Sequence, residues 1–438
     1  MDFLILIICI TCLVLLITWV KLNPFLAFLI ISIIAGLLLG MPMSNIAKSV
    51  NKGIGDTLGS LVIVIVLGAM LGKLVAESGA AQKITNEMRK IFGEKYLVWA
   101  MSLTGFIVGI PLYYNVGFVL MIPIIFSVSY SYKLPLVYVG LPMLASLSVM
   151  HGFLPPHPSP MALVTQFHAD MATTFFYGLM IAIPAIIIAG PLFSRTIKNI
   201  KSNSLKVFPS QDMPDEKLPG IGNSIFSSLL PVLLIAATAA LAKIFSTNTQ
   251  VKNIADFLGD PTLVMLLTII IATYTLGIAR GTKLTDIMNL YVEAVKDIAM
   301  ILLIIGSAGI LKQIFIDSGV GTEIATALGA WKLPPLLLAW IITAILRICL
   351  GSATIAGLTA VGVVYPLTLQ THVDPNLMVL SVGAGSIFCS HVNDSAFWLY
   401  KEYFGLSMKD TFRSWSLMET IVSLVGLVGV LLLNQILF

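Results

Sequence analysis

The sequence predicts an all-α polytopic membrane protein built from two inverted-topology repeats. Each repeat is expected to hold about five spans and one re-entrant helical hairpin, with helices interrupted at the midplane. Of the 438 residues, 58% are hydrophobic and only 11% are charged, against about 25% charged residues in soluble domains. Apolar runs long enough to cross a bilayer recur along the chain, and the two halves match when one is shifted by 240 residues along the other.

The predicted spans are apolar runs of roughly 20 residues. In chain order they cover residues 3 to 20, 24 to 40, 58 to 76, 134 to 168, 173 to 193, 225 to 245, 262 to 280, 298 to 316, 376 to 400 and 416 to 437. The fourth and ninth runs are interrupted by polar residues. The first run lacks the basic start and the small-residue cleavage site of a signal peptide, so we expect a retained span.

Two further apolar stretches, 97 to 131 and 337 to 371, are too long for one straight span. Their centres, GIPLYYNVG and RICLGSATIAG, contain Gly together with proline or polar residues. Irregular backbone is tolerated at membrane depth where it is buried in protein or lines a cavity. We therefore predict a helical hairpin in each stretch that enters and leaves the membrane on the same side.

The internal match divides the chain. His151 falls on His391, and the hairpin 97–131 falls on 337–371. We predict a first repeat at residues 1–193, a cytoplasmic linker at 194–223 and a second repeat at 224–438. Five crossings in each repeat give the repeats opposite orientations. A cytoplasmic linker also places most of the 25 Lys and Arg residues on the cytoplasmic side, as the positive-inside rule requires.

Several function classes find no support in the sequence. The net charge of +4 comes without a cluster of basic and aromatic residues, so no nucleic-acid partner is expected. Cys9 and Cys12 form a C-x-x-C in the middle of an apolar run, where neither a redox nor a metal role is expected. No nucleotide-binding or metalloprotease motif is present, and we expect no cofactor, no metal and no catalytic residue.

Inverted repeats with interrupted helices are typical of secondary transporters, which bind substrate where broken helices meet. The breaks here read MHGFLPPHPSP, residues 150 to 160, and CSHVNDSAFW, residues 389 to 398. Helix N-termini at a break suit a carboxylate, and Asn, Ser and Thr side chains suit hydroxyl groups. The predicted substrate contacts at the breaks and hairpin tips are Tyr114, Asn115, His157, Ser159, Arg347, Ser352, Thr354, Asn393 and Ser395.

Proton coupling is predicted for Asp394, His151 and His391. A buried carboxylate such as Asp394 is costly when charged, although it also suits the role of N-cap for the resumed helix. Histidine titrates near neutral pH, but in an apolar segment it can equally be a structural donor. Arg347 is expected to contact substrate or Asp394, or to extend to the outer surface.

The motifs HGFLPPHPSP, GIPLYYNVGFVLMIPIIF, LRICLGSATIAGLTAVG and CSHVNDSAFWLYKEYFG together resemble the gluconate permease (gluconate:proton symporter) family of the ion-transporter superfamily. The likeness runs over essentially the whole chain. It implies a protein of the bacterial cytoplasmic (inner) membrane that imports gluconate or a related sugar acid with protons. It also implies a homodimer with elevator-like movement. Many members of that family carry an acidic residue where this sequence has Asn115, so Asp394 and the histidines would have to suffice for coupling.

Two alternatives stay open at this point. A carrier of another small anion or amino acid, such as D-glycerate, lactate or D-serine, would use the same chemistry, and sodium could replace the proton at Asn, Ser, Thr and carbonyl oxygens. An intramembrane enzyme would also place His and Asp at helix breaks. Such an enzyme would not need two inverted halves, however, so we favour the hypothesis of a transporter.

Overall fold

A computed structural model describes residues 2–80, 82–84, 87, 96–109, 114–155, 157–202, 213–245, 248–329, 331–371 and 373–437. The regular elements in these ranges are helices throughout, which confirms the all-α prediction. The helices of the first half are α1 (Asp2–Thr18), α2 (Pro24–Leu38), α3 (Met43–Glu77), α5 (Leu97–Gly109), α6 (Tyr114–Tyr132), α7 (Leu136–Phe153), α8 (Pro158–Gln166), α9 (Met171–Ile187), the π-helix η1 (Ile188–Leu192) and α10 (Phe193–Thr196).

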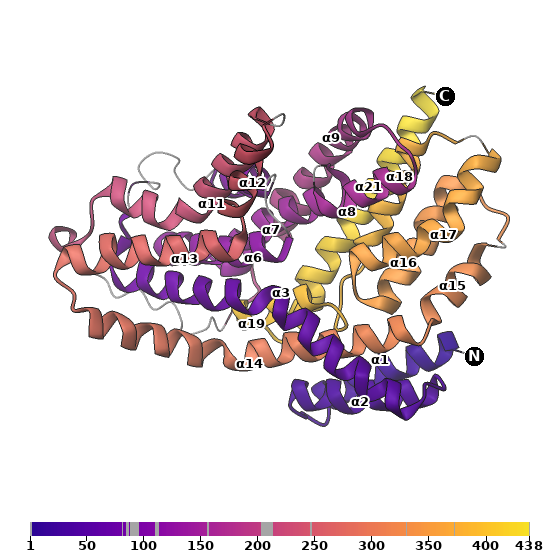
Figure 1. Ribbon diagram of the computed structural model, residues 1–438, viewed down its shortest axis with the longest axis horizontal. Helices are drawn as coiled ribbons and strands as arrows, with labels where there is room; N and C mark the ends of the chain where they lie inside the picture. The colour runs from indigo at the N-terminus through magenta and orange to yellow at the C-terminus, as the bar shows by residue number, and fades with distance from the viewer. Residues whose placement is uncertain are drawn as a thin grey trace.

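The remaining helices, from residue 215 to residue 437, complete the chain (Figure 1). They are η2 (Asp215–Lys217), α11 (Ile221–Ile244), α12 (Thr249–Leu258), α13 (Pro261–Ala272), η3 (Thr273–Gly277), η4 (Ile278–Arg280), α14 (Leu284–Asp317), α15 (Val320–Gly329), α16 (Pro335–Leu350), α17 (Ala353–Thr371), α18 (Pro375–Ser386), α19 (Ser395–Phe404), α20 (Met408–Thr411), η5 (Phe412–Ser416) and α21 (Leu417–Leu437).

Several helices begin at an Asn-Pro or Asp-Pro pair that serves as a start signal. Asn23, Asp260 and Asp374 each accept hydrogen bonds from first-turn N–H groups, and a proline follows each of them. The side-chain oxygen satisfies donors that the helix leaves unpaired, and proline at the first helical position has no N–H to lose. The starts of α2, α13 and α18 are therefore set by local sequence.

Six helices are long and apolar enough to cross a membrane among the described residues. They are Met43–Glu77, Leu136–Phe153, Met171–Thr196, Pro261–Arg280, Leu284–Asp317 and Met408–Leu437. A bent pair, Ile221–Pro231 and Leu233–Ala242, meets the condition only as one span with a 62° bend. The structure thus supports fewer full-length spans than the ten predicted. Helices α1 and α2 have only 17 and 15 residues, and the predicted span 376 to 400 divides into α18 and α19, of 12 and 10 residues.

The predicted span at 58 to 76 also begins too late. Helix α3 runs unbroken for 35 residues from Met43, through polar residues that the hydropathy pattern assigned to a loop. At 1.5 Å per residue it is about 50 Å long, well beyond the roughly 30 Å of a hydrocarbon core. Helix α14, with 34 residues, lies antiparallel beside it, since Gly53 contacts Gly309 and Lys73 lies near Glu293.

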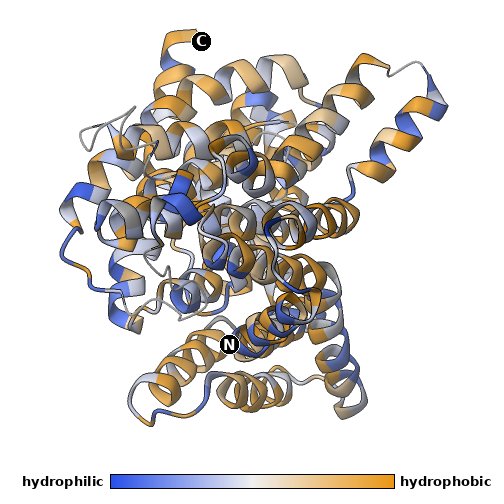
Figure 2. Ribbon diagram, turned by 90° about the vertical axis from the view of Figure 1, so that its left-hand side faces the viewer, coloured by the Kyte–Doolittle hydropathy of each residue, from blue (hydrophilic) through white to orange (hydrophobic). Residues whose placement is uncertain are grey.

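The outer faces of the helices are apolar. Along α9, Phe176, Met180 and Ile183 are 63%, 59% and 54% exposed, and their spacing of four and three residues places them on one face. Figure 2 shows hydrophobic ribbon along most helices, with the hydrophilic segments concentrated near helix ends and connections. A protein that exposes such faces is suited to lipid rather than water.

The centre of the molecule holds the two helices that lead into the predicted breaks. Helix α7 is buried along nearly its whole length, and so is α18. Near their ends they touch backbone to backbone, because a methyl group added at Gly383 would collide with the carbonyl oxygen of Gly152. The chain then leaves helical geometry before α8 in one case and before α19 in the other, so both predicted interruptions are present.

Candidate functional site

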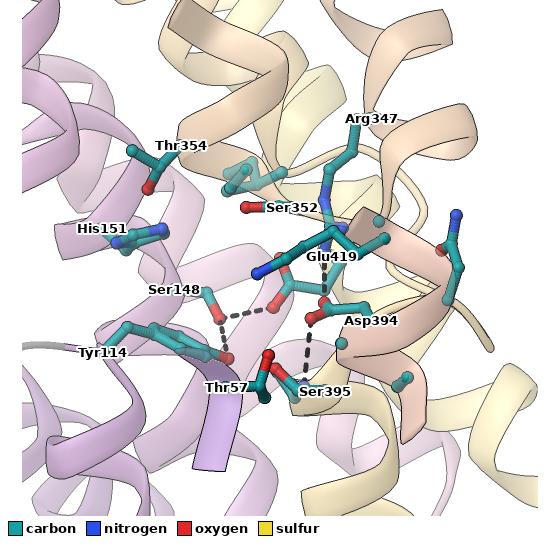
Figure 3. Close-up of a pocket in the computed structure, with 18 residues that line it drawn as sticks. Thr57, Tyr114, Ser148, His151, Arg347, Ser352, Thr354, Asp394, Ser395 and Glu419 are labelled. Carbon is teal, nitrogen blue, oxygen red and sulfur yellow. Dashed lines mark hydrogen bonds and ion pairs between the residues drawn. The ribbon is translucent and has the colours of Figure 1, made fainter. Parts of the chain in front are cut away.

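A polar cavity of about 160 Å³ lies beside the second break, and both halves of the chain contribute to it (Figure 3). That is room for about five water molecules, which suits a small polar solute. It is lined by Thr57, Tyr114, Ser148, His151, Ala308, Gly309, Lys312, Arg347, Gly351, Ser352, Ala353, Thr354, Ile387, Asn393, Asp394, Ser395, Ala396 and Glu419. We call this cavity the central pocket.

The second predicted hairpin supplies one wall of the central pocket. Helices α16 and α17 are joined by a two-residue turn, in which Gly351 has φ +68°. A methyl group at that position would also collide with the backbone carbonyl of Asn393. Glycine is thus required both for its conformation and for space, and the turn brings Ser352 and Thr354 to the pocket.

The second break supplies the adjacent wall. The Asn393 amide group donates to the carbonyl oxygens of Ile348 and Cys349, at 2.7 and 3.1 Å. These carbonyls end α16 and have no partner within that helix. The amide oxygen of Asn393 is buried and has no hydrogen-bond partner among the described residues. One side chain thereby holds the hairpin to the break and still offers an acceptor.

Asp394 starts the resumed helix and holds a charge partner. Its carboxylate accepts a hydrogen bond from the N–H of Ala396 at 3.0 Å, as an N-cap does. The same carboxylate forms an ion pair with Nη2 of Arg347 and accepts a hydrogen bond from the hydroxyl of Ser390. The N-cap role of Asp394 and its pairing with Arg347, both foreseen in the sequence, are therefore present in the structure, and proton coupling through Asp394 stays a prediction.

Arg347 is a buried positive charge in the central pocket. Arg347 is only 4% exposed, so the alternative that its side chain extends to the outer surface is wrong. Two of its guanidinium nitrogens, Nε and Nη1, are buried without a hydrogen-bond partner in the part of the chain that the structure describes. Buried polar groups are normally paired, and an unpaired charged donor is especially costly. These nitrogens are consequently ready to bind an acceptor that is not part of the protein.

The opposite wall comes from the first half and from α21. Ser148 donates a hydrogen bond to Oε1 of Glu419 at 2.5 Å, and the Tyr114 hydroxyl lies 3.3 Å from the Ser148 hydroxyl. His151 stands one turn from Ser148 on α7, and its Nδ1 lies 3.2 Å from Nδ1 of His157. Only one nitrogen of that pair donates to the other, so the tautomers of the two histidines are linked.

Most of the predicted site residues meet at the central pocket. Those that line it are Tyr114, His151, Arg347, Ser352, Thr354, Asn393, Asp394 and Ser395. His157 and Ser159 are buried but do not line it. His391 faces a different, apolar cavity near α1, and its Nε2 donates a hydrogen bond to the carbonyl oxygen of Ile348 at 3.0 Å. The side chain of Asn115 lies outside the described part of the chain.

Four polar residues of the central pocket were not predicted: Thr57, Ser148, Lys312 and Glu419. Lys312 lies near the end of the predicted span 298 to 316, where a lysine usually extends to the membrane surface. Glu419 lies four residues into the predicted span 416 to 437. The structure begins that span at Met408, which places Glu419 well inside it. The available signal was Ser407, which caps the start of α20: a span that begins after this N-cap would have placed Glu419 inside the membrane.

Comparison with known proteins agrees with the family resemblance of the motifs. Residues 1–436 match the sequence model described as GntP family permease. The chain is 46% identical to a high-affinity gluconate transporter of Escherichia coli (strain K12), with 95% of both chains covered. It is 42% identical to the Gnt-II system L-idonate transporter of the same organism, again over 95% of both chains. It is also 42% identical to a gluconate permease of Bacillus licheniformis, over 99% of both.

Proposed function

The chain belongs to the GntP family of permeases, and we propose that it imports gluconate or a closely related sugar acid by proton symport through the central pocket. Membership makes it a transport protein of the bacterial inner membrane, with several membrane-spanning helices, and not an enzyme. Relatives that share over 40% of its residues are named for gluconate and for L-idonate. Both names describe small polyhydroxy carboxylates, which sets the substrate class of the proposal.

The observation that carries the proposal is the pair of unpartnered guanidinium nitrogens of Arg347. Asp394 occupies Nη2 and leaves Nε and Nη1 buried and unused among the described residues. Nε and Nη1 lie on different sides of the guanidinium group, and each can donate a separate charge-assisted hydrogen bond to a carboxylate or hydroxyl oxygen. Lys312 lines the same pocket and adds a second positive charge. The carboxylate of the substrate would bind at Arg347 and satisfy donors that the protein leaves open.

The hydroxyl groups of a sugar acid also find partners in this pocket. Ser352, Thr354 and Ser395 line it, and each hydroxyl can donate or accept. The open amide oxygen of Asn393 accepts from a substrate hydroxyl. Helices α17 and α19 both begin at the pocket, and their N-terminal partial positive charge favours an anion. The arrangement suits one carboxylate with several hydroxyls better than a purely apolar acid.

Coupling to protons follows from the charge of the substrate. Moving a monoanion inward against a membrane potential costs about 2.3 kcal/mol per 100 mV. One proton carried along cancels that charge. Asp394 and His151, two of the three predicted coupling residues, line the central pocket, whereas His391 does not. A titratable group within the pocket is therefore the place to seek the proton carrier.

The two-repeat architecture is part of the proposal, with residues 1–193 and 224–438 as inverted repeats and 194–223 as the cytoplasmic linker. Helix order supports it. The long α3 precedes the helix pair α5 and α6, and the long α14 precedes α15 and then the helix pair α16 and α17. An interrupted helix follows each pair. Under this proposal both pairs are re-entrant hairpins, residues 110–113 of the first lying outside the described residues. A homodimer is proposed from the family resemblance.

The deciding experiment is uptake of labelled gluconate into proteoliposomes. An imposed inward proton gradient and an inward sodium gradient are compared, each with excess unlabelled L-idonate, D-glycerate, lactate or D-serine, and with protein-free liposomes as the control. Accumulation driven by protons and blocked by sugar acids alone supports the proposal. Accumulation driven only by sodium overturns the coupling, and competition by lactate or D-serine but not by L-idonate overturns the substrate class.

A further inference from the structure

Glu419 differs from Asp394, the other acid among the described residues that line the central pocket. It lies on α21, is 3% exposed, and lines the pocket. Its hydrogen bond at 2.5 Å comes from Ser148, a neutral hydroxyl on α7. No Lys, Arg or His nitrogen lies within ion-pairing distance of it in the described part of the chain. An acid in such surroundings has no fixed positive charge that commits it to the ionised form.

Asp394, in contrast, has three fixed partners. It is paired with Arg347, accepts from Ser390, and caps the first turn of α19. A proton on Asp394 would leave the buried Arg347 without its partner, and an unpaired buried charge is strongly destabilising. Asp394 therefore suits the work of holding Arg347 in place better than that of taking up and releasing a proton.

The charge balance of the central pocket shows what a proton on Glu419 would do. The titratable and charged groups that face Glu419 across the pocket are Tyr114 on α6, His151 on α7, Lys312 on α14, Arg347 on α16 and Asp394 before α19. With His151 and Tyr114 neutral, Lys312 and Arg347 contribute two positive charges and Asp394 one negative charge. The pocket is then neutral with Glu419 ionised and carries one positive charge with Glu419 protonated.

We propose that Glu419 carries the coupled proton, so that one proton on its carboxyl group accompanies one substrate monoanion. The inference rests on the proposed function, since it needs an anionic substrate in the central pocket. On the outer side Glu419 takes a proton and the pocket becomes attractive to the anion. When substrate leaves toward the cytoplasm, the single positive charge is again uncompensated and Glu419 releases its proton. One proton and one anion then cross together.

The contacts around Glu419 accommodate both of its forms without a change in heavy-atom positions. When Glu419 is ionised, Ser148 donates to it, and the Tyr114 hydroxyl donates to Ser148. When Glu419 is protonated, it donates to Ser148, whose single proton then turns to Tyr114. Serine and tyrosine hydroxyls each donate once and also accept, so the distances of 2.5 and 3.3 Å serve either arrangement.

The test compares wild type with Glu419→Gln, which keeps the shape of the protonated acid but holds no exchangeable charge. Glu402→Gln is the matched control, because Glu402 lies outside the pocket and pairs with Lys401 at 2.7 Å. Three quantities are measured with labelled gluconate: exchange without a gradient, accumulation driven by a proton gradient, and affinity as a function of pH. Glu419→Asp, which restores a titratable group, is measured in parallel.

Wild type and Glu402→Gln should lose affinity by up to about tenfold per pH unit on the alkaline side, as binding linked to one proton requires. Glu419→Gln should still exchange gluconate, with an affinity that no longer depends on pH, and should lose proton-driven accumulation. Glu419→Asp should recover both. A Glu419→Gln protein that accumulates gluconate with the pH dependence of wild type overturns the inference.

Failure of the two proposals is distinguishable. If wild type exchanges no gluconate at all, the proposed function is wrong. If wild type accumulates gluconate with protons and Glu419→Gln does too, only the role of Glu419 is wrong. Should Glu419→Gln fail to fold, Ser148→Ala provides the second test, because it removes only the hydroxyl that contacts Glu419. The midpoint of the pH profile should then move, and an unmoved midpoint contradicts the inference.

Discussion

Gly53 and Gly309 meet where α3 crosses α14, and a methyl carbon added to either would lie 2.6 Å from the carbonyl oxygen of the other. The two longest helices of the chain thus touch through their backbones. The crossing borders the central pocket, because Gly309 and Thr57, one turn beyond Gly53, line it. Close contact between small residues is the usual way in which membrane helices pack, and here it sets how near the two halves approach at the pocket.

The first prediction concerns this crossing. Gly53→Ala should lower the thermal stability of the detergent-solubilised protein, because overpacking costs about 1–3 kcal/mol. Gly55→Ala is the matched control two residues away on the same helix, where an added methyl group meets nothing within 4 Å. That control should be neutral or slightly stabilising, since alanine favours a helix over glycine. Equal melting temperatures for the two variants would show that the crossing is not tight.

Substrate binding should depend on the shape of Arg347 and not only on its charge. Arg347→Lys keeps the positive charge but removes the two open guanidinium donors. A hydrogen bond to a charged group contributes about 1.5–3 kcal/mol, so the affinity for gluconate should fall about 10- to 100-fold. Arg280→Lys, at an arginine outside the central pocket, is the control. Calorimetric titration of both purified variants decides between them, and equal affinities would place the carboxylate elsewhere.

Lys312 should contribute charge and no directional contact. Lys312→Gln should weaken gluconate binding by about 1–2 kcal/mol, which corresponds to about 5- to 30-fold. Lys312→Arg should retain most of the affinity, because the charge remains. The comparison is made by competition for exchange in proteoliposomes at low salt. An equal loss in both variants would point to packing against the pocket wall rather than electrostatic attraction.

Asp170, at the N-terminus of α9 and outside its membrane-spanning segment, gives a prediction for pH. Hydrogen bonds from the Thr173 hydroxyl and N–H, both 2.7 Å long, lower the pKa of the Asp170 carboxyl. The folded protein therefore favours the ionised form. The stabilisation is present at neutral pH and is lost as the pH falls below about 4, the usual range of aspartate.

Hydrogen exchange of the first-turn amides of α9 measures that effect. After correction for intrinsic rates, exchange at Thr173 should speed up on acidification in wild type. Asp170→Asn should show faster exchange already at neutral pH, because asparagine lacks the negative charge that stabilises a helix N-terminus. It should show little further change with acid, because asparagine does not titrate. The same acid response in both proteins would assign the effect to another group.

Much of the fold could be predicted from the sequence, because its signals are local. Composition alone places the chain in a membrane, and the Asp-Pro and Asn-Pro pairs mark helix starts. The interruptions near His157 and Asp394 follow from proline and polar residues that no apolar helix accommodates. The polar residues of the second hairpin tip and second break were found for the same reason. What such signals do not convey is helix length at polar segments, as the unbroken α3 shows.

Only the tertiary structure decided which polar groups share the central pocket. Thr57, Lys312 and Glu419 lie on α3, α14 and α21, far apart in the chain. Lys312 and Glu419 stand within apolar runs, and Thr57 stands in the polar segment before the predicted span 58 to 76. Which face of a helix turns inward depends on how its neighbours pack against it, and no local pattern records that. By itself the sequence determined that the chain lies in a membrane, where two of its helices are interrupted, and which polar side chains lie at those interruptions. The packing of α7, α14, α16 and α21 around one cavity determined which acid faces Ser148 and which acid holds Arg347.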